Sequence, residues 1–400
     1  MKGPLDGIKV IECGHWIVAP IAGSILGDLG ANVIKIEERG RGDLMRGLTH
    51  ISGQKVERNF IIEFSNRSKR GIALDLKKES GRKIVYKLIE RADVFIHNFQ
   101  AGIPERLGLD YETLSQHNPR IIYGQGSGWG PEGPDRGKPA YAPLMEARAG
   151  LTRLLMYPGK PPIPLPNAFG DIITAIILVL AILAALLYRE RSGMGQKVDV
   201  SGLGSLMALE MTALHAFFIG GKEELRMARP NVGNPLWYNY ECADGKWIAL
   251  NMLQADRYWH TFCQAMDIRE LEKDPRFENF EVRRQNAEEF IDILERIFRS
   301  RPLSEWLQHL ENQGELVYGP VQSIPELSAD PQVVANGYLI DFDHPVYGIM
   351  KVLGFPYKFS RTPASVKGAA PELGQHTEEV LLEMGYDWEH IIKLKDEEII

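Results

Sequence analysis

The chain has 400 residues, of which 44% are hydrophobic and 25% are charged, and these are ordinary proportions for a globular protein. Its formal net charge of −7 disfavours a nucleic-acid-binding function, because proteins of that class normally carry a basic face. Any anionic ligand must therefore be held by local clusters of lysine and arginine. The length predicts two or three domains, long enough together to bury a large core.

The three cysteines, Cys13, Cys242 and Cys263, are odd in number and have no metal-site spacing. We expect them to be reduced, in a cytoplasmic protein that binds no metal. The first residues, MKGPLDGIKVIE, contain no apolar core of a secretion signal, and this also favours the cytoplasm.

The first 130 residues alternate between strand and helix patterns. Between the predicted strands lie a helix at 20–29 and an amphipathic helix at 79–92. Strands that alternate with helices predict a parallel, doubly wound sheet and therefore an α/β fold. The predicted strands are 8–12, 32–37, 72–76, 93–98 and 120–123.

Residues 124–170 are rich in glycine and proline, so we expect loops with little regular structure. Loops of this length in a compact domain are more often functional than idle. The segment 172–188 then runs apolar for 17 residues except for Thr174. It is at the short limit of a membrane span, and an acid directly precedes it, so we predict a buried core helix and no membrane. The turn and strand of SGMGQKVDV follow.

The pattern changes in the second half of the chain. Residues 205–221 are predicted to be helical, and from about 229 short aromatic strands begin in PLWYNYECADGKWIALNM. These strands and the helices after them indicate a second, smaller domain of mixed structure. The helices are predicted at 255–267, 284–299 and 303–313, with a charged helical tail at 370–400.

The first strand, turn and helix have the order of a dinucleotide-binding unit, and Glu37 or Glu38 stands where a ribose-binding acid would be. The turn reads CGHWIVAPIAG and lacks the GxGxxG pattern, however. Its bulky Trp16 and Ile17 would block a pyrophosphate. A nicotinamide cofactor is therefore not expected.

Basic residues gather near the predicted ends of successive strands, where ligands bind in such sheets. Each cluster alone is compatible with a solvated surface, but together they predict a shared anionic ligand. The clusters are Arg39, Arg41 and Arg46, then Arg67, Lys69 and Arg70, then Arg106.

Asp171 follows Gly170 and opens the apolar helix. It is either the residue that caps the helix or a nucleophilic carboxylate, and both roles suit an anion at a helix N-terminus. His15, at the end of the first strand, is either a packed histidine or part of a site. Cys13 is expected to be a core thiol, and His376 to cap a helix.

Taken together, these segments resemble the class III CoA-transferases, the group of formyl-CoA and carnitine CoA-transferases. The likeness runs in order over nearly the whole chain. It is carried by PLDGIKVIE at 4–12, LGANVIKIE at 29–37, NRSKRGIALDL at 66–76, ADVFIHNFQAGIPERLGLDYETL at 92–114, NPRIIYGQGSGWGPEGP at 118–134, GDIITAIILVLAILAALLYRERSGMGQKVDV at 170–200 and GQHT at 374–377.

The resemblance implies a Rossmann-like large domain with a parallel sheet, a smaller α+β domain, and an interlaced homodimer. The domain boundaries we expect are 1–200 for the first part of the large domain, 201–228 for a linker helix, 229–325 for the small domain, and 326–400 for the return to the large domain.

The resemblance also implies that an acyl-CoA donor passes coenzyme A, as a substrate, to a carboxylic acid acceptor. CoA would travel through an aspartyl anhydride and an aspartyl-CoA thioester. Asp171 matches the nucleophile of the family. The residues that match its CoA site are His15, Asn98, Phe99, Arg106, Lys138 and Tyr141, and Arg39 is expected to bind the phosphate that Glu38 cannot.

The sequence departs from formyl-CoA transferase at several positions. Ile17 stands in place of a glutamine, Glu38 in place of an arginine, and the region of the glycine-rich lid, RPNVGNPLW, is shorter. Trp16 and Val18, and the aromatic residues at 237, 238 and 240, are core residues or line the acid site. If they line it, we expect acids larger than formate or oxalate.

Two other functions remain open. A 2-methylacyl-CoA racemase would share the fold, but Tyr141 stands where a racemase has its histidine, and a neutral tyrosine is a poor base near pH 7. A non-catalytic subunit of a heteromeric transferase would share it too, but such a subunit has no need of Asp171.

Overall fold

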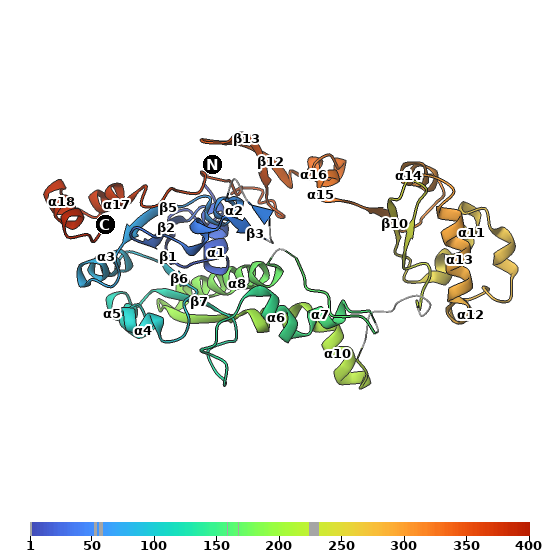
Figure 1. Cartoon of the computed structure of the whole chain (residues 1–400), viewed down its shortest axis with the longest axis horizontal. Coiled ribbons are helices and arrows are strands. Elements are labelled where there is room, and N and C mark those ends of the chain that lie inside the picture. The colour runs from blue at the N-terminus through green and yellow to red at the C-terminus, as the bar shows by residue number, and fades with distance from the viewer. Residues whose placement is uncertain (1, 52–53, 56–58, 158, 167, 224–231) are drawn as a thin grey trace. The chain divides into compact units, whose positions relative to one another are not determined.

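The structure is a computed structural model that describes residues 2–51, 54–55, 59–157, 159–166, 168–223 and 232–400 (Figure 1). The chain forms two compact units. The first unit contains Met1–Leu154, Ile163–Glu224 and Ile340–Ile400, and the second contains Leu155–Pro162 and Leu225–Leu339.

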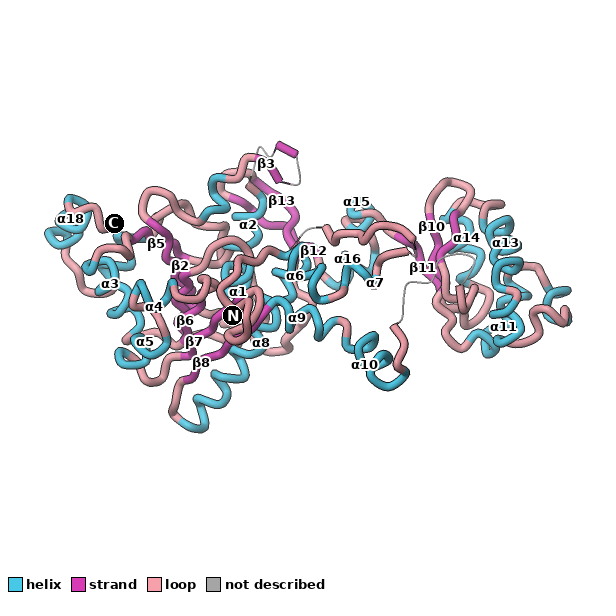
Figure 2. The backbone as a smooth tube through the Cα atoms, turned by 60° about the horizontal axis from the view of Figure 1, so that its bottom comes forward, coloured by secondary structure: helices cyan, strands magenta, loops and turns pink. Residues whose placement is uncertain are grey.

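The first unit is built on a six-stranded sheet in the order β5-β2-β1-β6-β7-β8, shown in magenta in Figure 2. All neighbouring strands are parallel, and Ile11 pairs with both Ile34 and Phe95. This confirms the predicted α/β fold. The strands are β1 (Lys9–Cys13), β2 (Asn32–Glu38), β5 (Arg70–Leu74), β6 (Val94–His97), β7 (Ile122–Ser127) and β8 (Gln196–Ser201).

Helices cover both faces of this sheet, which is why its central strands are apolar on both sides. Side chains alternate along each strand, so Val10 and Ile11 enter different cores. Val10 packs with α1 (Val18–Asp28) and α8 (Phe169–Ser192), and Ile11 packs with α3 (Glu79–Ile89).

Helix α8 differs from its prediction in two ways. It begins at Phe169 after Ala168, whose φ of 56° is left-handed, so Asp171 lies in the first turn and does not cap the helix. Only one face is buried: Leu178 is fully buried, whereas Leu180 is 62% exposed. The helix is long and apolar enough to cross a membrane, and 44% of an 18-residue apolar stretch within it is buried. The prediction of a buried core helix therefore holds for one face.

The segment expected to be irregular contains a helix. The residues APLMEARA form α6 (Ala142–Ala149), with a proline in its first turn and the left-handed Gly150 at its end. The remaining elements of the first unit are η1 (Leu44–Gly47), β3 (His50–Ile51), β4 (Gln54–Lys55), α2 (Phe60–Asn66), α4 (Ile103–Leu107), α5 (Tyr111–His117), α7 (Leu151–Leu154), α9 (Gly202–Leu209), α10 (Met211–Gly220), β12 (Leu339–His344), β13 (Gly348–Leu353), α17 (Thr377–Glu383) and α18 (Trp388–Asp396).

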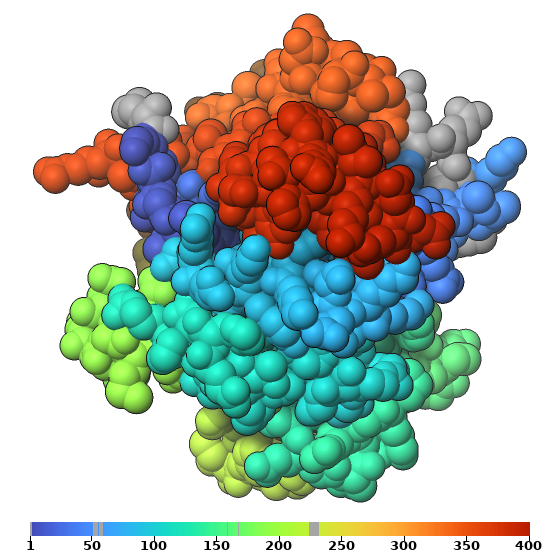
Figure 3. Space-filling view, turned by 90° about the vertical axis from the view of Figure 1, so that its left-hand side faces the viewer, coloured from blue at the N-terminus to red at the C-terminus, as the bar shows by residue number. Residues whose placement is uncertain are grey.

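The end of the chain packs against the edge strand β5. His376 Nδ1 accepts a hydrogen bond from the Gly71 N–H, and Thr377 Oγ1 accepts one from the Ala73 N–H. Figure 3 shows the C-terminal residues in red on the same face as the light-blue residues that follow β5. Two segments far apart in sequence thus complete one unit.

The second unit has a three-stranded antiparallel sheet in the order β11-β10-β9. Helices pack on it around a core of buried aromatic side chains that includes Phe262 and Phe290. Its elements are β9 (Asn239–Glu241), β10 (Trp247–Leu250), α11 (Ala255–Ala265), η2 (Arg269–Lys273), α12 (Phe280–Gln285), α13 (Ala287–Phe298), α14 (Leu303–Glu311), β11 (Tyr318–Val321), α15 (Ile324–Leu327) and α16 (Pro331–Asn336).

A buried ionic cluster of Glu12, Lys35, Asp43 and Lys69 lies beneath the turn that follows β1. Lys35 Nζ lies 3.0 Å from both Glu12 Oε1 and Asp43 Oδ2, and Lys69 Nζ lies 2.6 Å from Glu12 Oε2. Burial alone would lower the pKa of Lys35, but the charges of Glu12 and Asp43 outweigh it and raise the pKa. Lys35 is therefore charged at any physiological pH.

We expect Lys35→Met to destabilise the protein by about 3–5 kcal/mol, because it leaves two buried carboxylates without their shared cation. Urea unfolding measures the loss. Lys83→Met is the matched control, since the ion pair of Lys83 with Glu79 is exposed, and we expect no resolvable change there. A Lys35 variant as stable as the control would contradict this account of the cluster.

Candidate active site

A cavity of about 690 Å³ lies in the first unit, at the carboxyl ends of the central strands. The strand order reverses between β1 and β6, and ligands bind at such a reversal in open parallel sheets. The lining comes from the turn after β1, the loop after β6, the end of β7 with its loop, and the start of α8.

Most of the predicted site residues meet in this cavity. Arg39 is outside the lining: its Nε donates to the main-chain oxygen of Ile400, and its guanidinium lies 3.6 Å from Glu398. The CoA-binding roles of all these residues remain predictions. The predicted residues in the lining are His15, Asn98, Phe99, Arg106, Lys138, Tyr141 and Asp171.

The turn after β1 is held from two sides. The carboxamide of Asn98 accepts from the His15 N–H at 3.0 Å and donates to the His15 carbonyl at 2.7 Å. The Trp16 N–H donates to Asp43 Oδ1, and Trp16 has a left-handed φ of 65°, a strained conformation for a bulky residue. The side chain of Asn98 is therefore engaged within the protein, so any ligand contact would come from its main chain or from His15.

His15 is neutral at physiological pH. Burial lowers its pKa, and the charge of Asp43 only partly opposes that effect. The Nδ1 atom is buried and has no hydrogen-bond partner in the part of the chain that the structure describes. The Nδ1 atom of His15 is thus not engaged by another described residue.

Asp171 faces the cavity from the first turn of α8. A helix N-terminus favours an anion, but burial and then the charge of Glu146 raise the pKa of Asp171 to about 7. Within the described residues no hydrogen bond or ion pair reaches its carboxylate. Near neutral pH a large share of the molecules therefore carries an ionised Asp171 carboxylate that has no partner among the described residues.

Glu146 has no counterpart in the sequence prediction. It is fully buried in α6, and its Oε1 accepts a hydrogen bond of 2.9 Å from the N–H of Gly170, the residue before Asp171. The sequence predicts an irregular loop for residues 124–170, which include Glu146. Nothing in the sequence therefore indicated that Glu146 lies beside α8. Lys77, Arg136 and Lys197 also line the cavity and were missed. Arg136 is two residues from Lys138 and could have been found by that spacing.

The prediction that three basic clusters share one anionic ligand is wrong for most of their members. Five of the seven cations are paired with acids of the same chain, and Arg106 alone among the seven lines the cavity. The intramolecular pairs are Arg39 with Glu398, Arg46 with Glu37, Arg67 with Asp28, Lys69 with Glu12, and Arg70 with Glu379 and Glu383.

An apolar wall lies in the same cavity. Trp16, Ile17 and Val18 all line it. The rings of Trp16 and Tyr141 pack edge-to-face, with their centroids 5.6 Å apart, and Tyr141 is 58% exposed. The cavity therefore offers cations and apolar surface together.

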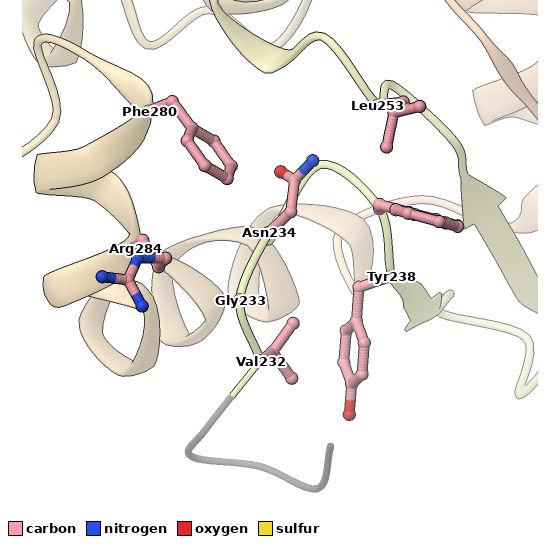
Figure 4. Close-up of a pocket in the computed structure, with 8 residues that line it drawn as sticks. Val232, Gly233, Asn234, Tyr238, Leu253, Phe280 and Arg284 are labelled. Atoms are coloured by element: carbon pink, nitrogen blue, oxygen red, sulfur yellow. The ribbon is translucent and has the colours of Figure 1, made fainter. Parts of the chain in front are cut away.

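A second cavity of about 390 Å³ lies in the second unit (Figure 4). Trp237 and Tyr238 line it, and Phe280 and Arg284 form its other wall. Tyr240, a sequence-based candidate for the acid site, is fully buried in the core of the second unit.

The described residues of the two units show no cluster of metal ligands. The described residues include no group of three or more histidine, cysteine or acidic side chains that could hold a metal ion. Cys13, Cys242 and Cys263 are free and buried. Burial raises the pKa of Cys13 to about 12, so this thiol beside the cavity is not ionised.

The profile of CoA-transferase family III matches residues 5–377 of the chain. The (R)-2-hydroxy-4-methylpentanoate CoA-transferase of Clostridioides difficile is 31% identical over 405 residues, which cover 99% of this chain and 99% of the relative. The acetyl-CoA:oxalate CoA-transferase of Acetobacter aceti is 32% identical over 340 residues, which cover 85% and 86%.

A solved structure shares the fold as well. It is a CAIB/BAIF family protein from Brucella suis, with a TM-score of 0.85 and 30% sequence identity. The match covers 96% of this chain and 100% of the solved one. Sequence and structure thus agree over both units.

We expect Asp171→Asn to become more stable than the wild type as the pH rises. The ordinary pKa of an aspartate is 3.8, and burial raises that of Asp171 to about 7 in the folded state. Between these values the unfolded chain releases a proton that the folded chain keeps, so the wild type loses stability, whereas the Asn variant does not.

The free energy of unfolding of Asp171→Asn should exceed that of the wild type by an amount that grows between pH 4 and 7. Above pH 7 the difference should stay constant, at about 2–4 kcal/mol at pH 8. Thermal unfolding of both proteins across this range measures it. Glu132→Gln, at an exposed glutamate in the loop after β7, is the control. A stability difference independent of pH would show that Asp171 titrates normally.

Proposed function

The chain belongs to CoA-transferase family III, and we propose that it moves coenzyme A from an acyl-CoA thioester to a carboxylic acid, with Asp171 as the covalent nucleophile. The observation that supports this most is the Asp171 carboxylate, without a partner among the described residues, in a cavity that also holds six other residues expected from the family. The ionised form of this carboxylate can attack directly, without a general base to remove a proton.

In the first half-reaction, the Asp171 carboxylate attacks the thioester carbonyl, the C–S bond breaks, and a mixed anhydride and CoA thiolate form. The thiolate then attacks the aspartyl carbonyl of the anhydride. This step releases the first acid as its carboxylate and leaves CoA on Asp171 as a thioester.

The second half-reaction runs the same steps in reverse with another acid. The acceptor carboxylate attacks the aspartyl thioester and expels the CoA thiolate. The thiolate then attacks the acyl carbonyl of the new anhydride, which yields the new acyl-CoA and regenerates the Asp171 carboxylate. One thioester replaces another, so no ATP is consumed.

Each addition step places negative charge on a carbonyl oxygen, which backbone N–H groups must stabilise. The Gly170 N–H is already bound to Glu146. We therefore expect the glycine-rich segment at 126–130, which lines the cavity, to supply the donors. A Cβ on Gly128 would lie 2.1 Å from that of Ala140, so this close approach requires glycine.

The phosphates of CoA need cations at the mouth of the cavity. Arg106 and Arg136 are the arginines in its lining, and arginine suits bidentate phosphate binding. Lys138 lies 2.5 Å from Asp135, and Lys77 lies 2.8 Å from Glu38, so both are already paired and are weaker candidates. Arg39 would have to leave the chain terminus to take part.

We further propose a homodimer, interlaced as in the family. The outer face of α8 and nearly all of α10 are apolar but exposed: Leu180 is 62% exposed, Phe218 74% and Ile219 86%. No residue of α10 is buried. An apolar surface of this kind needs cover, and a second copy of the chain would provide it. With three free, buried cysteines we expect the dimer in the reducing cytoplasm.

Asp171→Asn and Asp171→Ala should abolish transfer and leave CoA binding largely intact, because the side chain reacts but does not hold the nucleotide. Incubation with an acyl-CoA and hydroxylamine should label this residue alone, as mass spectrometry would show. Transfer by the Asn variant within tenfold of the wild type would reject the assignment.

We expect oxalate and formate to be poor acceptors. The acids in the names of the relatives range from oxalate to a branched hydroxy acid, so family membership alone does not predict the acceptor of this chain. The apolar wall of Trp16, Ile17 and Val18 favours an acid with an apolar side group. Burying one such group is worth roughly 1.5–3 kcal/mol, or about one to two decades in kcat/KM.

The measurement compares kcat/KM for oxalate with that for bulkier acids, using one donor. Ile17→Gln should shift the preference toward small acids, and Ile25→Gln, further along α1, serves as the control. A higher value for oxalate than for every bulkier acid would show that this wall does not contact the acceptor.

Light scattering should give twice the 45.1 kDa of one chain, at all protein concentrations tested. Interlaced chains cannot separate without unfolding, so dilution should not release monomers. Phe218→Glu together with Ile219→Glu should yield aggregated or misassembled protein. A stable wild-type monomer would reject the homodimer.

A further inference from the structure

Glu146 lies directly behind the nucleophile that we propose. It is fully buried in α6, and a Cβ built on Gly170 would lie 3.4 Å from its Oε1, so the two segments pack closely. Oε1 accepts the Gly170 N–H at 2.9 Å. Oε2 is buried too, but within the described residues it has no hydrogen-bond partner.

A buried carboxylate oxygen without a partner is costly and rarely kept unless it has a use. The nearby cations do not neutralise it, because each has an acid of its own: Arg148 pairs with Asp135, Arg153 with Glu223, and Lys197 with Asp199. Charged or titratable groups lie on several elements packed against α6 and α8. They are His15 before α1, Asp28 on α1, Tyr123 on β7, Arg148 on α6, Arg153 on α7, Lys197 and Asp199 on β8, and Glu210 after α9.

Resting on the proposed role of Asp171, we propose that Glu146 is a positioning residue that fixes the place of the nucleophile and sets its electrostatic surroundings. Oε1 holds the first turn of α8 through Gly170, one residue before Asp171. The Glu146 carboxylate also acts electrostatically on Asp171. Burial first, and Glu146 second, raise the pKa of Asp171.

This arrangement has a chemical consequence. A more basic carboxylate is a stronger nucleophile toward a thioester, provided that enough of it is ionised at the working pH. Glu146 would therefore increase the reactivity of Asp171 above neutral pH and reduce its ionised fraction below. A residue that only filled space would affect neither.

Two substitutions separate the two roles. Glu146→Gln keeps an oxygen for the Gly170 N–H but removes the charge, whereas Glu146→Leu removes both at similar volume. Glu210→Gln is the matched control: Glu210 is also a buried acid with an unpartnered oxygen, and its pKa is raised by burial, but it does not contact Gly170.

The first measurement needs no turnover. The stability difference between Asp171→Asn and its parent is followed against pH in the wild-type, Glu146→Gln and Glu210→Gln backgrounds. We expect the midpoint to fall by about one pH unit with Glu146→Gln, since a like charge has been removed, and to stay in place with Glu210→Gln. An unmoved midpoint in Glu146→Gln would overturn the electrostatic role.

The second measurement uses transfer. In the Glu146→Gln variant, the rise of kcat/KM on the acidic side of its pH profile should also move to lower pH, and the KM for the acyl-CoA should be unchanged. Glu146→Leu should lower kcat by about tenfold, because the start of α8 loses its anchor, and Glu146→Gln should restore most of it. A kcat for the Leu variant equal to the wild type would overturn the positioning role.

Failure of the two proposals can be told apart. A wild-type protein without transfer activity would refute the proposed function, while the unfolding midpoints still report whether Glu146 acts on Asp171. An active wild type whose midpoint ignores Glu146→Gln would refute only this inference.

Discussion

The buried cluster of Lys35, Glu12, Asp43 and Lys69 is the constraint on which the candidate site depends. Charged side chains with no exposed surface are expensive to desolvate, and such a cluster often adds little net stability. What it contributes is position. Asp43 accepts the Trp16 N–H, and Lys35 donates to the Gly14 carbonyl. The turn that carries His15, Trp16 and Ile17 is thereby held in a strained conformation that loop residues alone would not keep.

The other half of the site depends on how α8 begins. The apolar face of this helix packs in the core against the sheet, and Asp171 in its first turn lines the cavity. Two opposing effects act there on Asp171. The helix dipole favours the carboxylate, whereas burial and the charge of Glu146 disfavour it, and the pKa of about 7 shows that the second pair prevails. The nucleophile we propose is thus kept basic by its surroundings.

The sheet was predictable because its central strands β1 and β6 are short, largely apolar runs between turn residues, and such runs need little context. The cavity was predictable in outline, since strand ends in a parallel sheet meet at one edge. The start of α8 was not, because Ala168 has a left-handed φ that alanine seldom adopts. Helix α6 was hidden by its proline and by the glycine-rich context, and Glu146 was hidden with it.

The basic residues show a deeper limit. A cation in a sequence looks the same whether it meets a ligand or an acid of the same chain. Arg46 and Arg106 both follow strands of the sheet, yet Arg46 is bound by Glu37 and Arg106 lines the cavity. The partner acids lie up to several hundred residues away, as Glu379 does from Arg70. Only the fold shows which cations it has already neutralised.

The cations and the apolar wall of the cavity come from different parts of the first unit. Arg106 lies in α4 and Arg136 in the loop after β7, whereas the apolar wall comes from the turn after β1 and the first residue of α1. A substitution at Ile17 therefore changes the shape offered to an acid without touching the arginines that we expect to hold phosphate. Asp171 and Glu146 belong to neither wall, because α6 and α8 carry them. The nucleophile that we propose lies on α8, and the residues that we expect to select the acid lie on and beside one short turn. A change of acid substrate would therefore not require a change in the proposed transfer chemistry.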